Sequence, residues 1–176
     1  TVYNPAATYA ANLDALTRTA ETHRLKRWDI GFVGHLSEGR VEALDRIFKA
    51  FPNSWWASLR TNRVFEQAAD IYTQSRIVWN NAVKDDVNMR VFEALATRSF
   101  LLTQWVPDLA MLFEPGVHLV AYDSMNDCIE KMHYYLKHDE ERERIAEAGY
   151  REVLAKHTFK HRVAQILEGA GIEVGR

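Results

Sequence analysis

The chain has 176 residues, 47% of them hydrophobic and 26% charged, and it carries a formal net charge of −2. This length suits one α/β domain with one sizeable core, and the small negative charge excludes the basic surface of a typical nucleic-acid-binding protein. No apolar run reaches about 18 residues and no signal-peptide pattern is present, so we expect no membrane span, no export and a cytoplasmic location.

Residues 1–28 form a lead-in segment that is rich in Ala and Thr and only weakly periodic. The chain begins at Thr1 without a Met, which we expect either of a processed product or of a piece of a longer protein. We place a domain boundary at this point and predict one Rossmann-like domain at residues 29–176.

Beyond the lead-in segment, apolar runs alternate with helical patterns. Residues 29–34 are typical of a buried strand that ends in Gly34, and the apolar residues from Val41 to Phe48 then recur at helical spacing. Later strands are expected at residues 54–59, 76–80, 100–103 and 117–121, with a helix at 63–73 between the first two. This order predicts a mostly parallel, doubly wound α/β sheet, which binds ligands at the carboxyl ends of its strands.

The last third of the chain is predicted to be helical. Ser124 with Asp127 matches a capping box, Asp139 starts a charged helix, and Thr158 is expected to cap the final helix. His157 and His161 have a spacing seen in metal sites, but Thr158 lies between them as a cap and no zincin pattern accompanies them. A structural role is therefore the better interpretation of both histidines.

The segment at residues 84–103 combines a turn, a helix start and a strand. If the helix opens near Asn88, the polar residues Arg90, Glu93 and Thr97 fall at i, i+3 and i+7. A helix N-terminus offers backbone N–H groups and partial positive charge to a phosphate, and Arg90 could add a bidentate cation. Glu93, one turn further in, is better placed to accept hydrogen bonds from sugar hydroxyls.

The sequence from Asn88 to Ala94 resembles the Asn-x-Arg-x-Phe-Glu-Ala core of the CgeB-like branch of GT-B glycosyltransferases, in their C-terminal nucleotide-sugar-binding domain. The wider superfamily carries a Glu-x7-Glu pair, and Asp85 with Glu93 has the same spacing. The resemblance, which runs from about residue 29 to residue 167, implies that Glu93 holds the ribose and that Asp85 lies toward the donor sugar and phosphates. It departs near Arg98, before the following strand, where the family usually has a Gly.

Two further loops are candidate parts of the site. The loop from Gly34 to Arg40 leaves the first strand at its carboxyl end, and the resemblance implies that His35 or Arg40 contacts the donor; a solvated turn is the alternative. Asn80 ends the third strand, where its amide could bond a base edge or a sugar hydroxyl, or could form the turn together with Asn81.

The resemblance implies a donor-binding domain that uses a nucleoside diphosphate sugar and needs neither a metal nor another cofactor. Arg90 would be the catalytic group, stabilising charge on the leaving diphosphate. The acceptor site and any base would lie on an N-terminal partner domain. Two other classes stay open: a non-catalytic nucleotide-binding module, and a protein-interaction domain in which Arg90 and Glu93 form an exposed ion pair of a few tenths of a kcal/mol.

Overall fold

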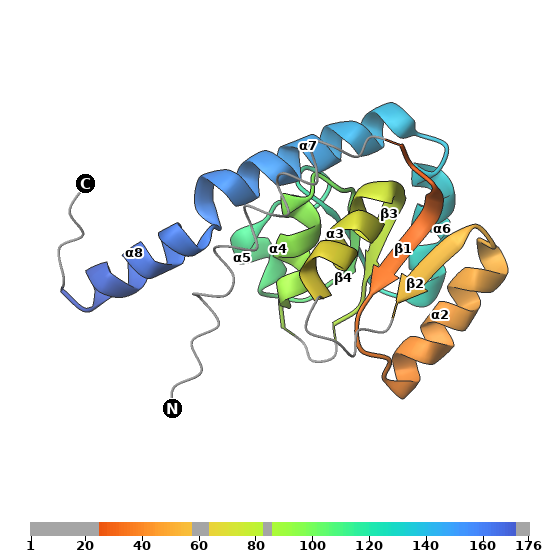
Figure 1. Ribbon diagram of the computed structural model, residues 1–176, viewed down its shortest axis with the longest axis horizontal. Coiled ribbons are helices and arrows are strands. Elements are labelled where there is room, and N and C mark those ends of the chain that lie inside the picture. The colour runs from red at the N-terminus through yellow and green to blue at the C-terminus, as the bar shows by residue number, and fades with distance from the viewer. Residues whose placement is uncertain (1–24, 58–63, 83–85, 172–176) are drawn as a thin grey trace.

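The computed structural model describes residues 25–57, 64–82 and 86–171 (Figure 1). Most of the expected lead-in segment and the candidate donor-binding residue Asp85 lie outside these ranges.

The core of the fold is a five-stranded sheet in which every described strand pair is parallel, as the sequence predicted. The strand order is β2-β1-β3-β4-β5. The central strand β3 is apolar on both faces, since Ile77, Val78 and Trp79 are all fully buried, as expected for a parallel sheet covered on both sides. The strands are β1 (Trp28–Val33), β2 (Ser54–Ala57), β3 (Ser75–Asn80), β4 (Leu101–Gln104) and β5 (Val120–Tyr122).

Helices cover both faces of this sheet (Figure 1). One face packs on α3 and α4, the other packs on α2 and α6, and α7 contributes buried residues to both cores. The last helix, α8, leads away from the body of the domain and has no buried residue (Figure 1). The helices are α2 (Glu38–Ala50), α3 (Val64–Gln74), α4 (Met89–Ala96), α5 (Leu109–Leu112), α6 (Met125–Tyr135), α7 (Asp139–Lys156) and α8 (Phe159–Gly169).

The strand order creates one switch point, between β1 and β3. From β1 the chain moves outward to β2 and then returns to the other side of β1 as β3. The connections that leave the carboxyl ends of β1 and β3 therefore run to opposite faces of the sheet, and folds of this type bind ligands in the crevice expected at such a point. Gly34 follows β1 at this point, and Asn80 ends β3.

Three predicted helix starts agree with the structure. Asn88 is the N-cap of α4 and its side chain accepts a hydrogen bond from the Arg90 N–H, while Ser124 accepts from the Asp127 N–H at the start of α6. Thr158 is the N-cap residue of α8, but its hydroxyl bonds the His161 ring at 2.7 Å and not a backbone N–H.

Strand β5 begins three residues later than predicted. Val117 and His118 look like the start of a strand because the run to Ala121 is apolar, but their N–H groups bond the Glu114 carbonyl and close a turn. Gly116 supplies the positive φ of 84° that this turn requires.

Arg98 has a φ of 54°, the only positive value for a non-glycine residue in the described parts of the chain. The N–H groups of Arg98 and Ser99 bond the carbonyls of Leu95 and Ala94, the hydrogen-bond pattern of a Schellman motif. The left-handed C′ position of that motif favours glycine, which explains why the resemblance leads one to expect Gly here. In this chain Arg98 also forms an ion pair with Glu147 of α7.

Candidate functional site

Arg90 projects from the first turn of α4 toward the ends of β1 and β3. Its Nη1 donates to the Asn80 side-chain oxygen at 2.8 Å, and its guanidinium lies against the Phe32 ring, 4.8 Å from the centroid. Its Nη2 fills the space beside Gly34, where a Cβ atom would come within 2.0 Å. A glycine after β1 therefore gives Arg90 its place at the switch point.

Arg40 approaches the same ring from α2, at 5.8 Å from the Phe32 centroid. It is only 4% exposed and donates to the backbone carbonyls of His35 and Asn81. These bonds tie the loop after β1 to the end of β3. The guanidinium of Arg40 thus has a structural role here. Its predicted contact with a donor stays a prediction.

The two guanidiniums give this end of the sheet a positive charge. No carboxylate among the described side chains forms an ion pair with Arg40 or Arg90. Burial, together with the charge of Arg90, lowers the pKa of Arg40. The Nε of Arg90 is buried and has no hydrogen-bond partner in the described part of the chain. An anion at this point would meet two guanidiniums that form no ion pair within the described residues.

Glu93 lies one turn along α4 from Arg90 and is half-buried. Both residues act on Tyr72 of α3, which is 1% exposed: burial raises the pKa of its hydroxyl, Arg90 opposes the rise and Glu93 adds to it. The carboxylate of Glu93 therefore lies near the guanidinium cluster. Thr97, expected on the same polar face, is instead buried and bonds Ser99.

The fold brings most of the predicted residues to one place, on or beside the ends of β1 and β3. His35 contributes its carbonyl to the wall of the crevice while its side chain is exposed. One of the N–H groups expected to serve a phosphate, that of Arg90, is already bonded by Asn88. The residues at or beside this crevice are Gly34, His35, Arg40, Asn80, Asn88, Arg90 and Glu93.

Sequence reasoning missed the supporting residues. Phe32 lies under both guanidiniums and Tyr72 lies beside Arg90. Thr103 of the adjacent strand β4 and Tyr122 of β5 hold Asn80. Their positions in the sequence could have indicated the role of two of these residues. Thr103 and Tyr122 are polar residues at the carboxyl ends of β4 and β5, where the strands of a parallel sheet present side chains to a ligand crevice.

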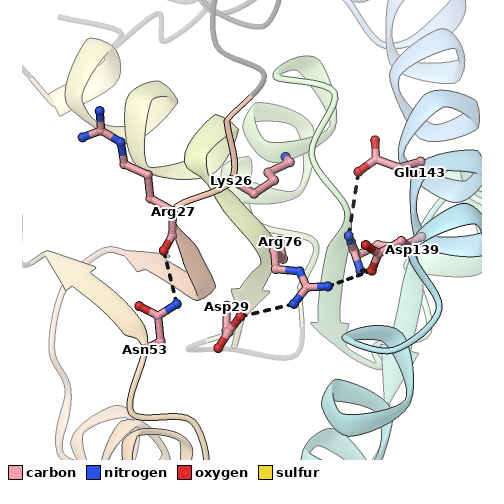
Figure 2. A pocket seen from close by; sticks show the side chains of 8 residues that line it. Lys26, Arg27, Asp29, Asn53, Arg76, Asp139 and Glu143 are labelled. Atoms are coloured by element: carbon pink, nitrogen blue, oxygen red, sulfur yellow. Dashed lines mark hydrogen bonds and ion pairs between the residues drawn. The ribbon is translucent and has the colours of Figure 1, made fainter.

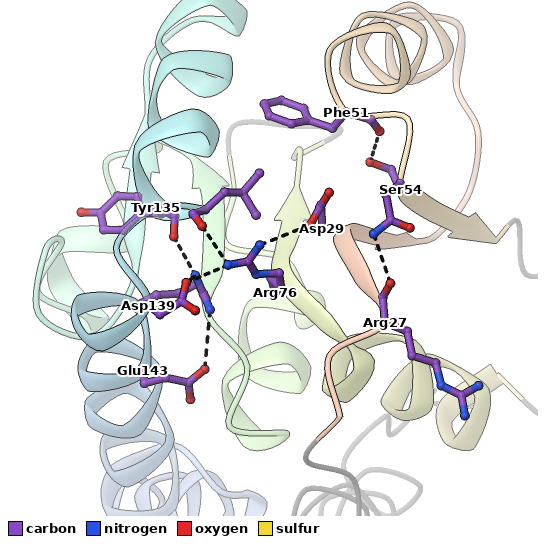
Figure 3. A network of polar contacts seen from close by, with 11 residues as sticks. Arg27, Asp29, Phe51, Ser54, Arg76, Tyr135, Asp139 and Glu143 are labelled. Carbon is purple, nitrogen blue, oxygen red and sulfur yellow. Dashed lines mark hydrogen bonds and ion pairs between the residues drawn. The ribbon is translucent and has the colours of Figure 1, made fainter.

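A second polar cluster lies at the opposite, amino-terminal edge of the sheet. It lines a cavity of about 420 Å³ beside Lys26, Arg76 and the start of α7 (Figure 2). Arg76 lies between Asp29 of β1 and Asp139 of α7, at 3.5 and 2.7 Å (Figure 3). Arg142, only 3% exposed, also bonds Asp139. Charges of both signs are paired here, so the cluster anchors α7 to the sheet.

In the described residues, no group of three or more His, Cys, Asp or Glu side chains is arranged to hold a metal ion. His157 bonds the Leu112 carbonyl and the Arg162 guanidinium, and its ring packs on Phe113. No helix in the described ranges is both long and apolar enough to cross a membrane. The metal-free reaction and the cytoplasmic location stay predictions.

The parallel sheet, the helices on both faces and the polar crevice at the switch point define a Rossmann-like α/β domain. The chain belongs to the family described as glycosyl transferase-like, whose profile matches residues 16–168. It is also 35% identical over 79 residues to the spore protein CgeB of Bacillus subtilis. That alignment spans 45% of this chain and 23% of CgeB.

Two solved structures with a similar fold illustrate this architecture. The C-terminal domain of a glycosyl transferase group 1 family protein from Francisella tularensis has a TM-score of 0.58 at 14% identity, with 89% of this chain and 96% of that chain covered. Sucrose-phosphate synthase from Thermosynechococcus elongatus has a TM-score of 0.60 at 12% identity, with 92% and 43% covered. The resemblance to C-terminal domains of GT-B enzymes is thereby confirmed for the fold.

Proposed function

We propose that this chain is the donor-binding domain of a glycosyltransferase that uses a nucleoside diphosphate sugar. The observation that carries the proposal is the placement of Arg90. It lies at the switch point of a parallel sheet, beside a second guanidinium, with no carboxylate partner among the described side chains. A diphosphate supplies the negative charge and the multiple acceptor oxygens that such a site lacks.

The same placement supports a role in the transfer step. When the bond between the anomeric carbon and the diphosphate breaks, negative charge develops on the leaving group. Arg90 and the N-terminus of α4 are positioned to stabilise that charge, and only an interaction that strengthens in the transition state accelerates the reaction. Because Arg90 is already held by Asn80, little reorganisation is needed as the charge develops.

Glu93 is proposed to accept hydrogen bonds from the ribose hydroxyls. It lies one turn inward from Arg90, so a nucleotide whose phosphates contact Arg90 places its sugar near the Glu93 carboxylate. The acceptor site and any catalytic base are assigned to a further domain of the full protein. This is consistent with sucrose-phosphate synthase, in which the matched region covers 43% of the chain.

Calorimetric titration tests the proposal. The wild type and Glu93→Ala are titrated with UDP, GDP, dTDP and their sugar conjugates. We expect binding to nucleotides of one base, weakened at least tenfold by the substitution, which corresponds to about 1.4 kcal/mol. No binding of any nucleotide to the folded wild type would contradict the proposal.

A further inference from the structure

Asn80 occupies an unusual position, because it connects three elements from a fully buried site. It is 1% exposed at the carboxyl end of β3. Its side-chain oxygen accepts from Arg90 Nη1 at 2.8 Å and from Asn88 Nδ2 at 3.2 Å, and its Nδ2 donates to Thr103 Oγ1 at 2.9 Å. Its backbone carbonyl accepts from the Tyr122 hydroxyl at 3.0 Å.

These contacts fix the direction of the amide. An asparagine amide has an acceptor end and a donor end, and the two ends are distinguished by their partners. Arg90 can only donate, so the oxygen must face α4, and the NH₂ group then faces the Thr103 hydroxyl on β4. Both ends of the amide are thus bonded to protein partners, and the residue is buried.

The chemical nature of this acceptor also determines the charge of the site. An amide oxygen holds a guanidinium by a hydrogen bond but leaves its positive charge unneutralised, whereas a carboxylate of the same size would form a buried ion pair with it. Arg90 is therefore oriented by a neutral partner, which suits a cation whose role is to bind an external anion.

We infer that Asn80 is a positioning residue which orients Arg90 for a diphosphate without contacting it; this inference rests on the proposed function. From the sequence, either a direct contact with the donor or a role in the turn is expected of Asn80. In the positioning role, Asn80 acts entirely through Arg90, and Thr103 acts through Asn80.

The test uses Asn80→Asp, which preserves the shape of the side chain, adds a negative charge and replaces the NH₂ donor with an acceptor oxygen. The Thr103 hydroxyl, which otherwise makes a long 3.5 Å bond to the Gln104 carbonyl, can rotate to donate to the new carboxylate. Asn126→Asp is the matched control: Asn126 Oδ1 accepts from the guanidinium of Arg46 at 2.7 Å on the exposed surface, so it places the same charge beside an arginine away from the site. Inorganic pyrophosphate and UDP are the probes, and affinities are measured at constant ionic strength.

We expect Asn80→Asp to weaken the binding of both probes at least tenfold while its urea midpoint stays at or above that of the wild type, and Asn126→Asp to bind as the wild type does. The decisive readout is a double-mutant cycle: in an Arg90→Gln background, Asn80→Asp should have no further effect on affinity. Should Asn80→Asp fail to fold, Thr103→Val takes its place, because it removes the group that orients the amide and should likewise lose its effect in the Arg90→Gln background.

Two results would overturn the inference while leaving the proposed function intact. One is wild-type affinity in Asn80→Asp. The other is an equal loss of affinity with and without Arg90, which would make Asn80 a direct contact. Failure of the wild type to bind either probe is a different result, because it contradicts the proposed function itself and with it the inference.

Discussion

The guanidinium of Arg90 occupies the space that a side chain at position 34 would fill. A Cβ atom on Gly34 would lie 2.0 Å from Arg90 Nη2. Gly34 does not have a positive φ, so its requirement is steric and not conformational. Gly34, which the sequence places in a candidate donor-binding loop, is in this structure in close approach to Arg90.

This relationship predicts the effect of Gly34→Ala. The atom that the new methyl group meets is the far end of a flexible side chain, so Arg90 should move aside and the fold should remain stable. UDP affinity should fall by roughly fivefold or more, because the cation leaves its position (~1 kcal/mol). Gly39→Ala is the control, since a Cβ atom there meets nothing within 4 Å. Titration of both variants checks the prediction, and equal affinities would contradict it.

Arg98 is predicted to be a strained position. We expect Arg98→Gly to be more stable than Arg98→Ala by roughly 0.5–1 kcal/mol, because the left-handed strain of alanine exceeds the extra chain entropy of glycine in the unfolded state. Both substitutions remove the ion pair with Glu147, so its loss cancels in the comparison. Urea unfolding of the two variants measures the difference. A more stable alanine variant would show that position 98 carries no such strain.

Gly149 lets α7 approach the helix that carries Arg90. A Cβ atom at this position would lie 2.2 Å from the His118 carbonyl oxygen and 2.7 Å from the Leu95 side chain. We expect Gly149→Ala to lower the free energy of unfolding by about 1–3 kcal/mol, the usual cost of overpacking. Gly169→Ala, at the exposed end of α8 where a Cβ atom meets nothing within 4 Å, should cause no loss. Denaturant titration of both variants measures the free energy of unfolding. Equal stability of the two variants would contradict the close packing at Gly149.

The cluster at the amino-terminal edge predicts a pH dependence of stability. Hydrogen bonds from Arg142 and Arg76 lower the pKa of Asp139 below its ordinary value of 3.8. A lowered pKa means that the carboxylate stabilises the fold above the ordinary value, and that this contribution is lost as the pH falls through the lowered pKa.

Asp139→Asn should therefore be less stable than the wild type at pH 7, and the difference should narrow in acid. The control Asp45→Asn removes one charge from an exposed pair with Lys49 and should have a small effect throughout. Thermal unfolding of the wild type, Asp139→Asn and Asp45→Asn from pH 7 down to pH 3 measures how the differences in stability change with pH. A difference that stays constant across the range would argue against the anchoring role of Asp139.

The sequence allowed prediction of those features that depend on local patterns. The apolar run of β3 and the Asn88 cap placed β3 and α4 to within one residue. The turn at Gly116 was missed because an apolar run hid it. The contact of Asn80 with Tyr122 could not be predicted, because it joins residues 42 positions apart through strand order alone. For the same reason the bond from Arg40 to the Asn81 carbonyl could not be predicted, because it joins residues 41 positions apart and appears only once β1 and β3 are adjacent.

The most direct test of this account is the affinity of the nucleoside diphosphate for Arg90→Gln, compared with the wild type and with Arg46→Gln as a surface control. If Arg90 binds the diphosphate, Arg90→Gln should bind at least tenfold more weakly, about 1.4 kcal/mol, while Arg46→Gln binds as the wild type does. Undiminished affinity in a folded Arg90→Gln protein would contradict the central claim that the cation at the β1/β3 switch point binds the donor.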